Sequence, residues 1–294
     1  MSSNKLDSDI LKQIENSQKD EITEYHIYQN LSKKIKNNHN KKVIQDISNQ
    51  EKKHYNFWKK YTKKDVSPSK LKIWFYLIFA KLFGITFSIK LMEKGEEDAQ
   101  VTYSKISKQV PEAKKIIEEE DEHEHKLIDM LDEERLKYMG SIIRGLNDAL
   151  VELTGAIAGL TFVLQKTNLI ALTGLITGIA ASFSMGGSEY LGSKSEENDS
   201  KNPKKASFYT ASAYIITVLF LIYPYLIFSD IYFSLGLMVV NALIVIFIFS
   251  FYISIAKDLS FKKRFSEMAS ISLGIAFLTF IIGFIIRATF GIEI

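Results

Sequence analysis

The residues best suited to chemistry are glutamates and histidines that recur at one spacing in the first half of the chain. Glu51 is followed by His54, and Glu120 by His123, so each pair lies one helical turn apart. Each pair interrupts a stripe of apolar residues, which turns it toward the interior of a helical domain. Carboxylate oxygens and imidazole nitrogens are ligands for transition metals. The alternative is a solvated, acid-rich face that binds no metal.

Two further helical stretches place acids at a second spacing. Glu21 precedes Tyr28 by seven residues, and Glu96 precedes Tyr103 by seven, with Glu93 one turn before Glu96. One inward glutamate from each of two helices, with one Glu-x-x-His from each of two others, is the ligand set of a carboxylate-bridged dinuclear iron or manganese site. The predicted ligands are Glu21, Glu51, His54, Glu93, Glu96, Glu120 and His123.

Four helices are needed to position these residues. Periodicity and chain breaks predict them at about 6–36, 40–63, 82–108 and 112–138. Two hairpins joined by a long crossover form a four-helix bundle of ferritin-like connectivity. The crossover contains a strongly apolar stretch, 71–89, in which Lys81 argues against a full membrane span. This stretch either covers the bundle or lies at a membrane surface.

The pattern resembles the ferritin-like, rubrerythrin-type superfamily over residues 6–138. The resemblance implies a resident pair of iron ions (Fe²⁺/Fe³⁺) or Mn²⁺. It assigns ligand roles to Glu21, Glu51, His54, Glu96, Glu120 and His123, with Glu93 as a further candidate. Two features depart from the family. A carboxylate usually stands where His123 lies, and the chain has no cysteine for the rubredoxin module that often accompanies rubrerythrins.

Charge divides the chain into two dissimilar halves. The first 140 residues hold 24 of the 34 acids, 26 of the 37 Lys and Arg, and all five histidines. The signs are interleaved, which gives no case for nucleic acid as a partner. The lack of cysteine excludes disulfides and iron–sulfur clusters. We therefore expect an all-α protein, with a ferritin-like four-helix bundle over 1–138 and a five-helix transmembrane domain over 139–294.

The second half contains five apolar stretches long enough to cross a bilayer. They run at about 144–165, 169–190, 207–228, 231–256 and 268–288. Lys and Arg gather before the first stretch and in the loops after the second and fourth, whereas the alternate loops hold only Lys166. Because cytoplasmic loops carry the excess of positive charge, we expect a cytosolic bundle and an outer C-terminus, in the cell membrane.

Acids lie within the first two of these stretches, where lipid makes charge costly. Two stripes share one spacing: Asp148, Glu152, Gly155 and Gly159 in the first, and Gly178, Ser182, Met185 and Glu189 in the second. We expect the small residues to pack the two helices together. The acids and the thioether of Met185 would then form a path for a transition-metal ion. Alternatively, the acids lie among lipid headgroups and the glycines serve packing alone.

This region resembles the vacuolar iron transporter family over residues 141–290. The matching residues are Asn147-Asp148-Ala149-Leu150, then Gly155 and Gly159, and then 184–191. The resemblance implies a homodimer that exports Fe²⁺ or Mn²⁺ in exchange for protons, with Asp148, Met185 and Glu189 on the path. Ala149 replaces the usual glycine, and Glu152 is an additional acid. The loop 192–205 is too short for the acidic domain of plant-type members, so the bundle takes its place.

The sequence thus predicts a divalent-metal exporter for Fe²⁺, with Mn²⁺ as the second candidate. The bundle would collect, sense or oxidise the metal, and membrane lipid and a second copy of the chain are the other expected partners. The alternative is a membrane-anchored di-iron oxidase or peroxide-scavenging enzyme that transports nothing. An anchor needs only one span and no buried charge, which favours the transporter.

Overall fold

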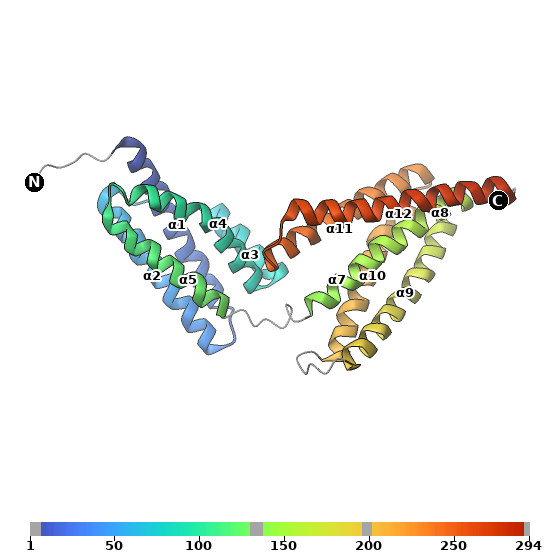
Figure 1. The fold of residues 1–294 in the computed structure, drawn as a ribbon, viewed down its shortest axis with the longest axis horizontal. Coiled ribbons are helices and arrows are strands. Elements are labelled where there is room, and N and C mark those ends of the chain that lie inside the picture. The colour runs from blue at the N-terminus through green and yellow to red at the C-terminus, as the bar shows by residue number, and fades with distance from the viewer. Residues whose placement is uncertain (1–6, 130–137, 196–201, 291–294) are drawn as a thin grey trace, which may run out of the picture. The chain divides into compact units, whose positions relative to one another are not determined.

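The computed structural model describes residues 7–129, 138–195 and 202–290, and within these ranges the regular structure is entirely helical (Figure 1). The side chains of 96–101, 124, 125, 128, 129 and 290 lie outside the description. The chain divides into two compact units, Met1–Glu133 and Glu134–Ile294. The predicted all-α class, with N-terminal helices followed by five long apolar helices, is confirmed.

The first unit contains α1 (Ser8–Ser32), α2 (Asn38–Thr62), α3 (Lys70–Phe83), α4 (Ile85–Ile106) and α5 (Lys114–Asp129). Asp7, Asn37 and Ser69 cap the first three helices by accepting hydrogen bonds from backbone N–H groups of the first turn. Pro111 opens a short 3₁₀ turn, Pro111–Ala113, that leads into α5.

The crossover between α2 and α4 contains a helix of its own. Gly84 has a φ of 104° and separates α3 from α4, so the predicted third helix begins at Ile85 rather than at 82. Ile73, Tyr76 and Leu77 on α3 pack against a buried cluster that includes Ala80. The expectation that 71–89 covers the bundle is therefore confirmed in part, since α3 also leaves a second face exposed.

Two apolar clusters bracket a polar layer along the bundle helices. One cluster includes Tyr28, Ile47 and Leu127, and the other includes Ile14 and Trp58. On α1, α2 and α5, the glutamates and histidines predicted as ligands lie in sequence between residues of the two clusters. Apolar packing on both sides fixes these helices against one another and buries the polar layer.

The second unit contains five helices long and apolar enough to cross a membrane, among the residues that the structure describes. The first consists of α7 (Met139–Asp148), a π-helix (Ala149–Leu153) and α8 (Thr154–Leu164). The others are α9 (Thr167–Ser195), α10 (Pro203–Ile227), α11 (Ile231–Ala256) and α12 (Phe261–Phe290). The protein is therefore an integral membrane protein.

The π-helix changes the register of the first span. It takes more residues per turn than an α-helix, and such bulges are frequent at functional sites. Gly155 is buried whereas Glu152 is exposed, and Asp148 is half-buried. The π turn therefore interrupts the continuous α-helical spacing on which the predicted shared face of these residues rests.

The glycines of the first two spans pack against other helices of the same chain. A Cβ atom on Gly283 of α12 would lie 2.6 Å from the carbonyl oxygen of Gly159, and one on Gly178 would lie 2.6 Å from Val218 of α10. Thr279 of α12 donates a hydrogen bond of 2.6 Å to the carbonyl of Gly155. Gly155 and Gly159 therefore pack against α12 and Gly178 against α10, while the homodimer stays a prediction.

Candidate metal centre

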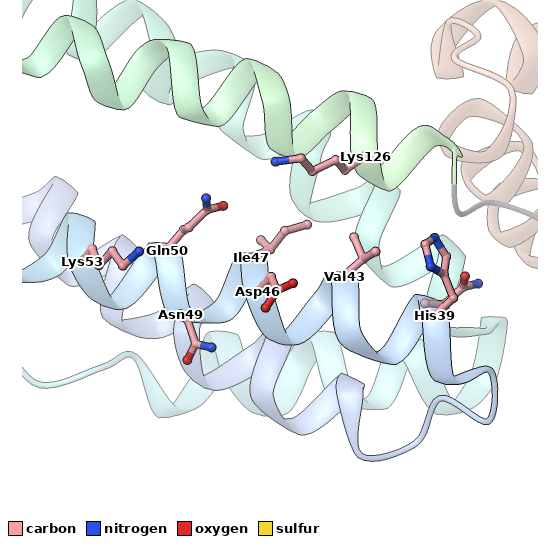
Figure 2. Close-up of a pocket in the computed structure, with 9 residues that line it drawn as sticks. His39, Val43, Asp46, Ile47, Asn49, Gln50, Lys53 and Lys126 are labelled. Carbon is pink, nitrogen blue, oxygen red and sulfur yellow. The ribbon is translucent and has the colours of Figure 1, made fainter.

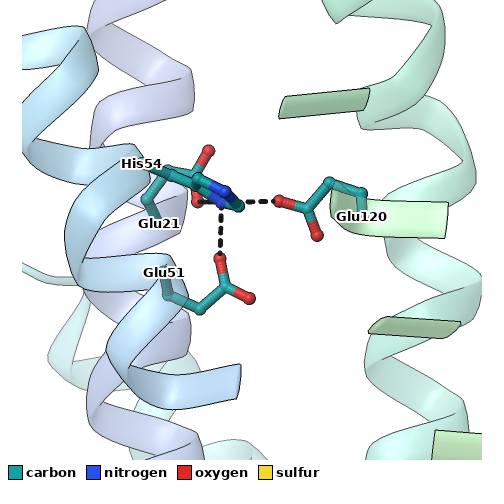
Figure 3. Close-up of side chains that lie close together, drawn as sticks. All are labelled: Glu21, Glu51, His54 and Glu120. Atoms are coloured by element: carbon teal, nitrogen blue, oxygen red, sulfur yellow. Dashed lines mark ion pairs between the residues drawn. The ribbon is translucent and has the colours of Figure 1, made fainter. Parts of the chain in front are cut away.

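Four side chains from three helices of the first unit converge on one buried point (Figure 3). Glu21 lies on α1, Glu51 and His54 on α2, and Glu120 on α5. One ligand atom from each lies within 4.8 Å of all the others. Glu21 is fully buried, while Glu51 and His54 are each 2% exposed. The sequence prediction that these four residues share a site is supported by their position in the structure.

The ring of His54 lies at the centre of this group. Its Nδ1 atom is 3.0 Å from Glu120 Oε1 and 3.4 Å from Glu21 Oε2. Glu51 Oε2 is also 3.4 Å from the same nitrogen. Three carboxylates so close to one nitrogen, with little water, need a positive charge among them.

His123 lies at the centre of a second group of carboxylates, beside the group around His54. Its Nδ1 atom lies 3.0 Å from Glu51 Oε1 and 3.3 Å from Glu120 Oε2, and its ring stacks against that of His54 with centroids 5.8 Å apart. Glu51 and Glu120 therefore each direct one oxygen toward His54 and the other toward His123. Two carboxylates that bridge two imidazoles are the arrangement expected of a dinuclear site.

The inward atoms of this cluster lack hydrogen bonds. Glu21 Oε2, Glu51 Oε2, His54 Nδ1 and His123 Nδ1 are buried, and none makes a hydrogen bond within the described part of the chain. Buried polar atoms are almost always satisfied, since an orphan atom costs about 1–3 kcal/mol. Oxygen and imidazole donors aimed at common points fit a transition-metal ion, which would satisfy all of them at once.

The outward atoms of the same side chains are held by neighbours. His54 Nε2 lies 2.8 Å from Glu119 Oε2, and His123 Nε2 is bonded to Gln50 Oε1. Trp58 and Tyr103 donate hydrogen bonds of 2.9 Å and 2.8 Å to Glu21 Oε1. Such outer partners fix the orientation of metal ligands and the tautomer of a histidine. The four residues Gln50, Trp58, Tyr103 and Glu119 thus hold the outward atoms, which leaves the other polar atoms of the same side chains pointing inward.

Protonation of the cluster reflects its burial. Burial raises the pKa of Glu21 to about 8, although His54 opposes this shift. Burial disfavours the charged form of His123, yet the carboxylates of Glu120 and Glu51 raise its pKa to about 9. The pKa of His54 is raised for the same reason by Glu120, Glu21 and Glu51. Protons therefore supply the positive charge at neutral pH, and a bound metal would displace them.

The acids of α4 are placed less completely. Glu93 accepts a hydrogen bond of 2.9 Å from Tyr28 of α1, just as Glu21 of α1 accepts one from Tyr103 of α4. The predicted pairs of acid and tyrosine therefore cross between the two helices. The side chain of Glu96, also predicted as a ligand, lies outside the described residues.

Sequence reasoning missed several residues around the centre. Glu24 lies one turn beyond Glu21, and burial, followed by repulsion from Glu51 and Glu21, raises its pKa well above the usual range. Its i, i+3 spacing from Glu21 was the available signal. Gln50 and Glu119 each directly precede a predicted ligand, but adjacent residues on a helix point in different directions. Neither carried a signal of its own.

A cavity of about 800 Å³ is lined by residues of α2, from His39 to Lys53, and by Lys126 of α5 (Figure 2). Its lining is mainly polar and charged: His39, Asn40, Val43, Asp46, Ile47, Asn49, Gln50, Lys53 and Lys126. Gln50 therefore lines this cavity and also bonds the ring of His123.

The acids of the membrane unit have different surroundings. Glu189 is 8% exposed and accepts hydrogen bonds from Arg144 Nε at 2.8 Å and from Ser141 Oγ at 2.6 Å. A second Arg144 nitrogen lies 2.5 Å from Glu189 Oε1, so the contact is bidentate. No local spacing predicts this pair, because its members are 45 residues apart.

Asp148 directly precedes the π-helix of the first span, and Glu152 lies within it. Glu152 accepts a hydrogen bond of 3.0 Å from the hydroxyl of Tyr214, and Asp148 is half-buried. Met185 packs against the buried core of the unit. Glu152 therefore lies beside a tyrosine of α10, whereas Met185 belongs to the apolar packing of the membrane unit.

These observations define an integral membrane protein whose N-terminal helical unit carries a buried cluster suited to a metal. Comparison with known families adds one finding: residues 139–200 match the VIT family. That range covers α7, the π-helix, α8 and α9, and it contains Asp148, Glu152, Met185 and Glu189. No curated protein sequence matches the chain. The match does not extend to the bundle.

Proposed function

We propose that the protein exports Fe²⁺ or Mn²⁺ from the cytosol, and that its N-terminal bundle is a ferritin-like domain that collects the ion. The observation that carries this proposal is the set of inward, buried ligand atoms of Glu21, Glu51, His54 and His123 that make no hydrogen bond. The match of residues 139–200 to the VIT family supports a role in metal handling for the membrane unit as well.

In the bundle, the residues themselves select and hold the ion. Glu21, Glu51, His54, Glu120 and His123 would hold the ion through their carboxylate oxygens and imidazole nitrogens. Imidazole ligands disfavour Mg²⁺ and Ca²⁺, which prefer oxygen. Trp58 and Tyr103 keep Glu21 oriented, and the apolar clusters on either side exclude water. The bound ions are the cargo of the membrane unit.

In the membrane unit, acids near the π-helix would receive the ion. Asp148 and Glu152 offer oxygen ligands, and the thioether of Met185 favours a transition metal over Mg²⁺. Glu189 would join them only after release from Arg144, because both of its oxygens now accept hydrogen bonds from that arginine. We expect protons from the outer side to displace the ion, which couples export to proton entry.

The test is Mn²⁺ uptake, or Fe²⁺ uptake without oxygen, into proteoliposomes with an acidic interior. Wild type is compared with Asp148→Asn, Glu120→Ala and Glu267→Gln, the last being an exposed acid of α12 and the matched control. We expect flux to fall more than tenfold in Asp148→Asn and to stay normal in the control. In Glu120→Ala, flux should slow at low metal concentration and recover at high concentration.

Each result has a defined meaning. Wild-type flux in Asp148→Asn would remove that residue from the path. No flux of either metal in the wild type would overturn the transport proposal as a whole.

A second function, oxidation of Fe²⁺, is favoured by one observation. Two carboxylates bridge two imidazoles, and Tyr103 is bonded to one of the acids beside them. Iron held by these residues would supply redox chemistry with oxygen or peroxide. Oxygen consumption by the full chain with Fe²⁺, lost in Glu51→Ala but kept in Asp148→Asn, would support this activity. Consumption unchanged by Glu51→Ala would refute it.

A further inference from the structure

Helix α3 carries apolar side chains on two opposite faces, and only one of them is packed. Ile73, Tyr76 and Leu77 contact the buried cluster of the bundle. The residues Leu71, Trp74, Phe75, Ile78 and Leu82 follow the steps i, i+3, i+4, i+7 and i+11, and so line a second face of the same helix. We call these five residues the outer stripe of α3.

The outer stripe is unusually exposed for apolar residues. Leu71, Trp74 and Leu82 are 76%, 63% and 62% exposed, and Phe75 is also exposed. Among the described residues of the first unit, Leu11 on α1 is the other large apolar side chain that is exposed. The exposed apolar surface of this unit is therefore concentrated on one helix, and such patches mark interaction sites.

Charge at the two ends of the outer stripe indicates what covers it. Lys70 lies four residues before Trp74, and Lys81 lies seven after it, so both share the face of the stripe, and both are exposed. Lysines at the edges of an apolar face extend their ammonium groups toward anionic headgroups, while tryptophan prefers the boundary between headgroups and acyl chains. No acid lies on α3 to oppose such an attraction.

The connection to the membrane unit brings a bilayer within reach. Nine residues, 130–138, join α5 to the first helix of the membrane unit. Even fully extended, nine residues span only about 30 Å. A bundle tethered so closely meets the lipid surface at a high effective concentration, which favours weak interfacial contacts.

We propose that the outer stripe of α3 docks the bundle on the lipid surface of the membrane in which the chain is anchored. Leu71, Trp74, Phe75, Ile78 and Leu82 enter the boundary between headgroups and acyl chains, while Lys70 and Lys81 bind anionic headgroups. Helix α3 then joins two surfaces, the core of the bundle on one face and lipid on the other. The inference depends on the five membrane-spanning helices and not on transport.

The chain offers a built-in probe, because it contains only two tryptophans, Trp58 and Trp74. Trp58 is fully buried in the bundle, so its emission, measured in Trp74→Phe, can be subtracted. The full chain is placed in nanodiscs of phosphatidylcholine and phosphatidylglycerol, with or without phosphatidylcholine brominated high on the acyl chains. An interfacial helix buries its apolar face about 5–10 Å deep, which brings Trp74 close to the bromine atoms.

We expect the Trp74 emission to lie at short wavelength and to lose about half its intensity in brominated discs. Leu71→Glu/Leu82→Glu should abolish the quenching, and since both leucines are exposed, the bundle should remain folded. Leu11→Glu is the matched control and should leave quenching unchanged. Lys70→Gln/Lys81→Gln should weaken it in phosphatidylglycerol discs and leave it unaltered in discs of phosphatidylcholine alone.

Two results would overturn the proposal. Long-wavelength emission that brominated lipid does not quench would show that the outer stripe faces water. Short-wavelength emission without quenching by brominated lipid would show that a second copy of the chain covers it.

Discussion

The bundle and the membrane unit both bury acids, but they neutralise them differently. In the bundle, Glu51 and His54 direct atoms without hydrogen bonds toward a common centre. In the membrane unit, Glu189 is held in a bidentate contact by Arg144, which lies on the same chain. The first arrangement is ready for a metal and needs only to release protons. The second must break an ion pair before it can bind anything.

The difference also concerns flexibility. The ligands of the bundle are fixed from outside by Glu119, Gln50 and Trp58, so the site is preorganised to retain an ion. The membrane acids lie at a π-helix and an ion pair, both of which can rearrange. Retention suits a collecting site, whereas rearrangement suits a path through which an ion passes.

Removal of His54 should have the largest effect. His54→Ala removes the imidazole nitrogen that faces Glu21, Glu51 and Glu120. Loss of an outer partner of a ligand typically lowers metal affinity 10–100-fold. Because His54 would itself be a ligand, we expect its loss to lower the affinity for Mn²⁺ by more than about a hundredfold. His39→Ala, an exposed histidine on the same helix, is the control and should bind like the wild type. Isothermal titration with Mn²⁺ measures both. Equal affinities for the two variants would refute the bundle site.

Metal affinity of the bundle should depend on pH. Glu21, with a pKa of about 8, and His123, with a pKa of about 9, hold protons at neutral pH that a metal must displace. Affinity should therefore rise between pH 6.5 and 9, by up to about tenfold per pH unit for each proton released. Mn²⁺ titrations across this range test the prediction, and an affinity independent of pH would contradict it.

Loss of Arg144 should destabilise the membrane unit. Arg144→Gln leaves the carboxylate of Glu189 without its bidentate partner. Because the arginine is partly exposed, we expect the free energy of unfolding to fall by about 2–3 kcal/mol, which is less than for a fully buried pair. The double variant Arg144→Gln/Glu189→Gln removes the stranded charge and should recover part of the loss. Thermal unfolding in detergent compares them. A single variant as stable as the wild type would show that the pair contributes nothing.

Packing in the membrane unit gives the smallest predicted effect. Gly283→Ala places a methyl group against the backbone of Gly159 and should destabilise the protein by about 1–2 kcal/mol. Gly274, on the same helix, has no neighbour within 4 Å of an added Cβ, so Gly274→Ala should be neutral or slightly stabilising. A lower melting temperature in Gly274→Ala than in Gly283→Ala would refute the close approach of α8 and α12.

The comparison also shows what a sequence can and cannot predict. Periodicity identified Glu51, His54 and Glu120, because ligands one turn apart on an apolar stripe must face inward together. It identified five apolar helices for the same reason. The ion pair of Arg144 and Glu189 joins distant parts of the chain, so no local spacing predicts it.

The π-helix was equally invisible in the sequence. Ala149–Leu153 contains ordinary helix-forming residues, and no residue type among them predicts the extra residue in the turn. The glycine stripes predicted close packing but did not predict which helices would pack against them. These helices are α12 for Gly159 and α10 for Gly178. Residue spacing predicts which side chains share one face of a helix, whereas the tertiary structure determines which helix packs against that face.

The most direct test of the account is the number of Mn²⁺ ions that the full chain binds tightly, measured by equilibrium dialysis in detergent. Wild type is compared with Glu120→Ala and Asp148→Asn. We predict two tightly bound ions per chain in the wild type and in Asp148→Asn, and none in Glu120→Ala, because Glu120 faces both histidines. Tight binding that persists in Glu120→Ala and disappears in Asp148→Asn would place the metal in the membrane unit and contradict the account.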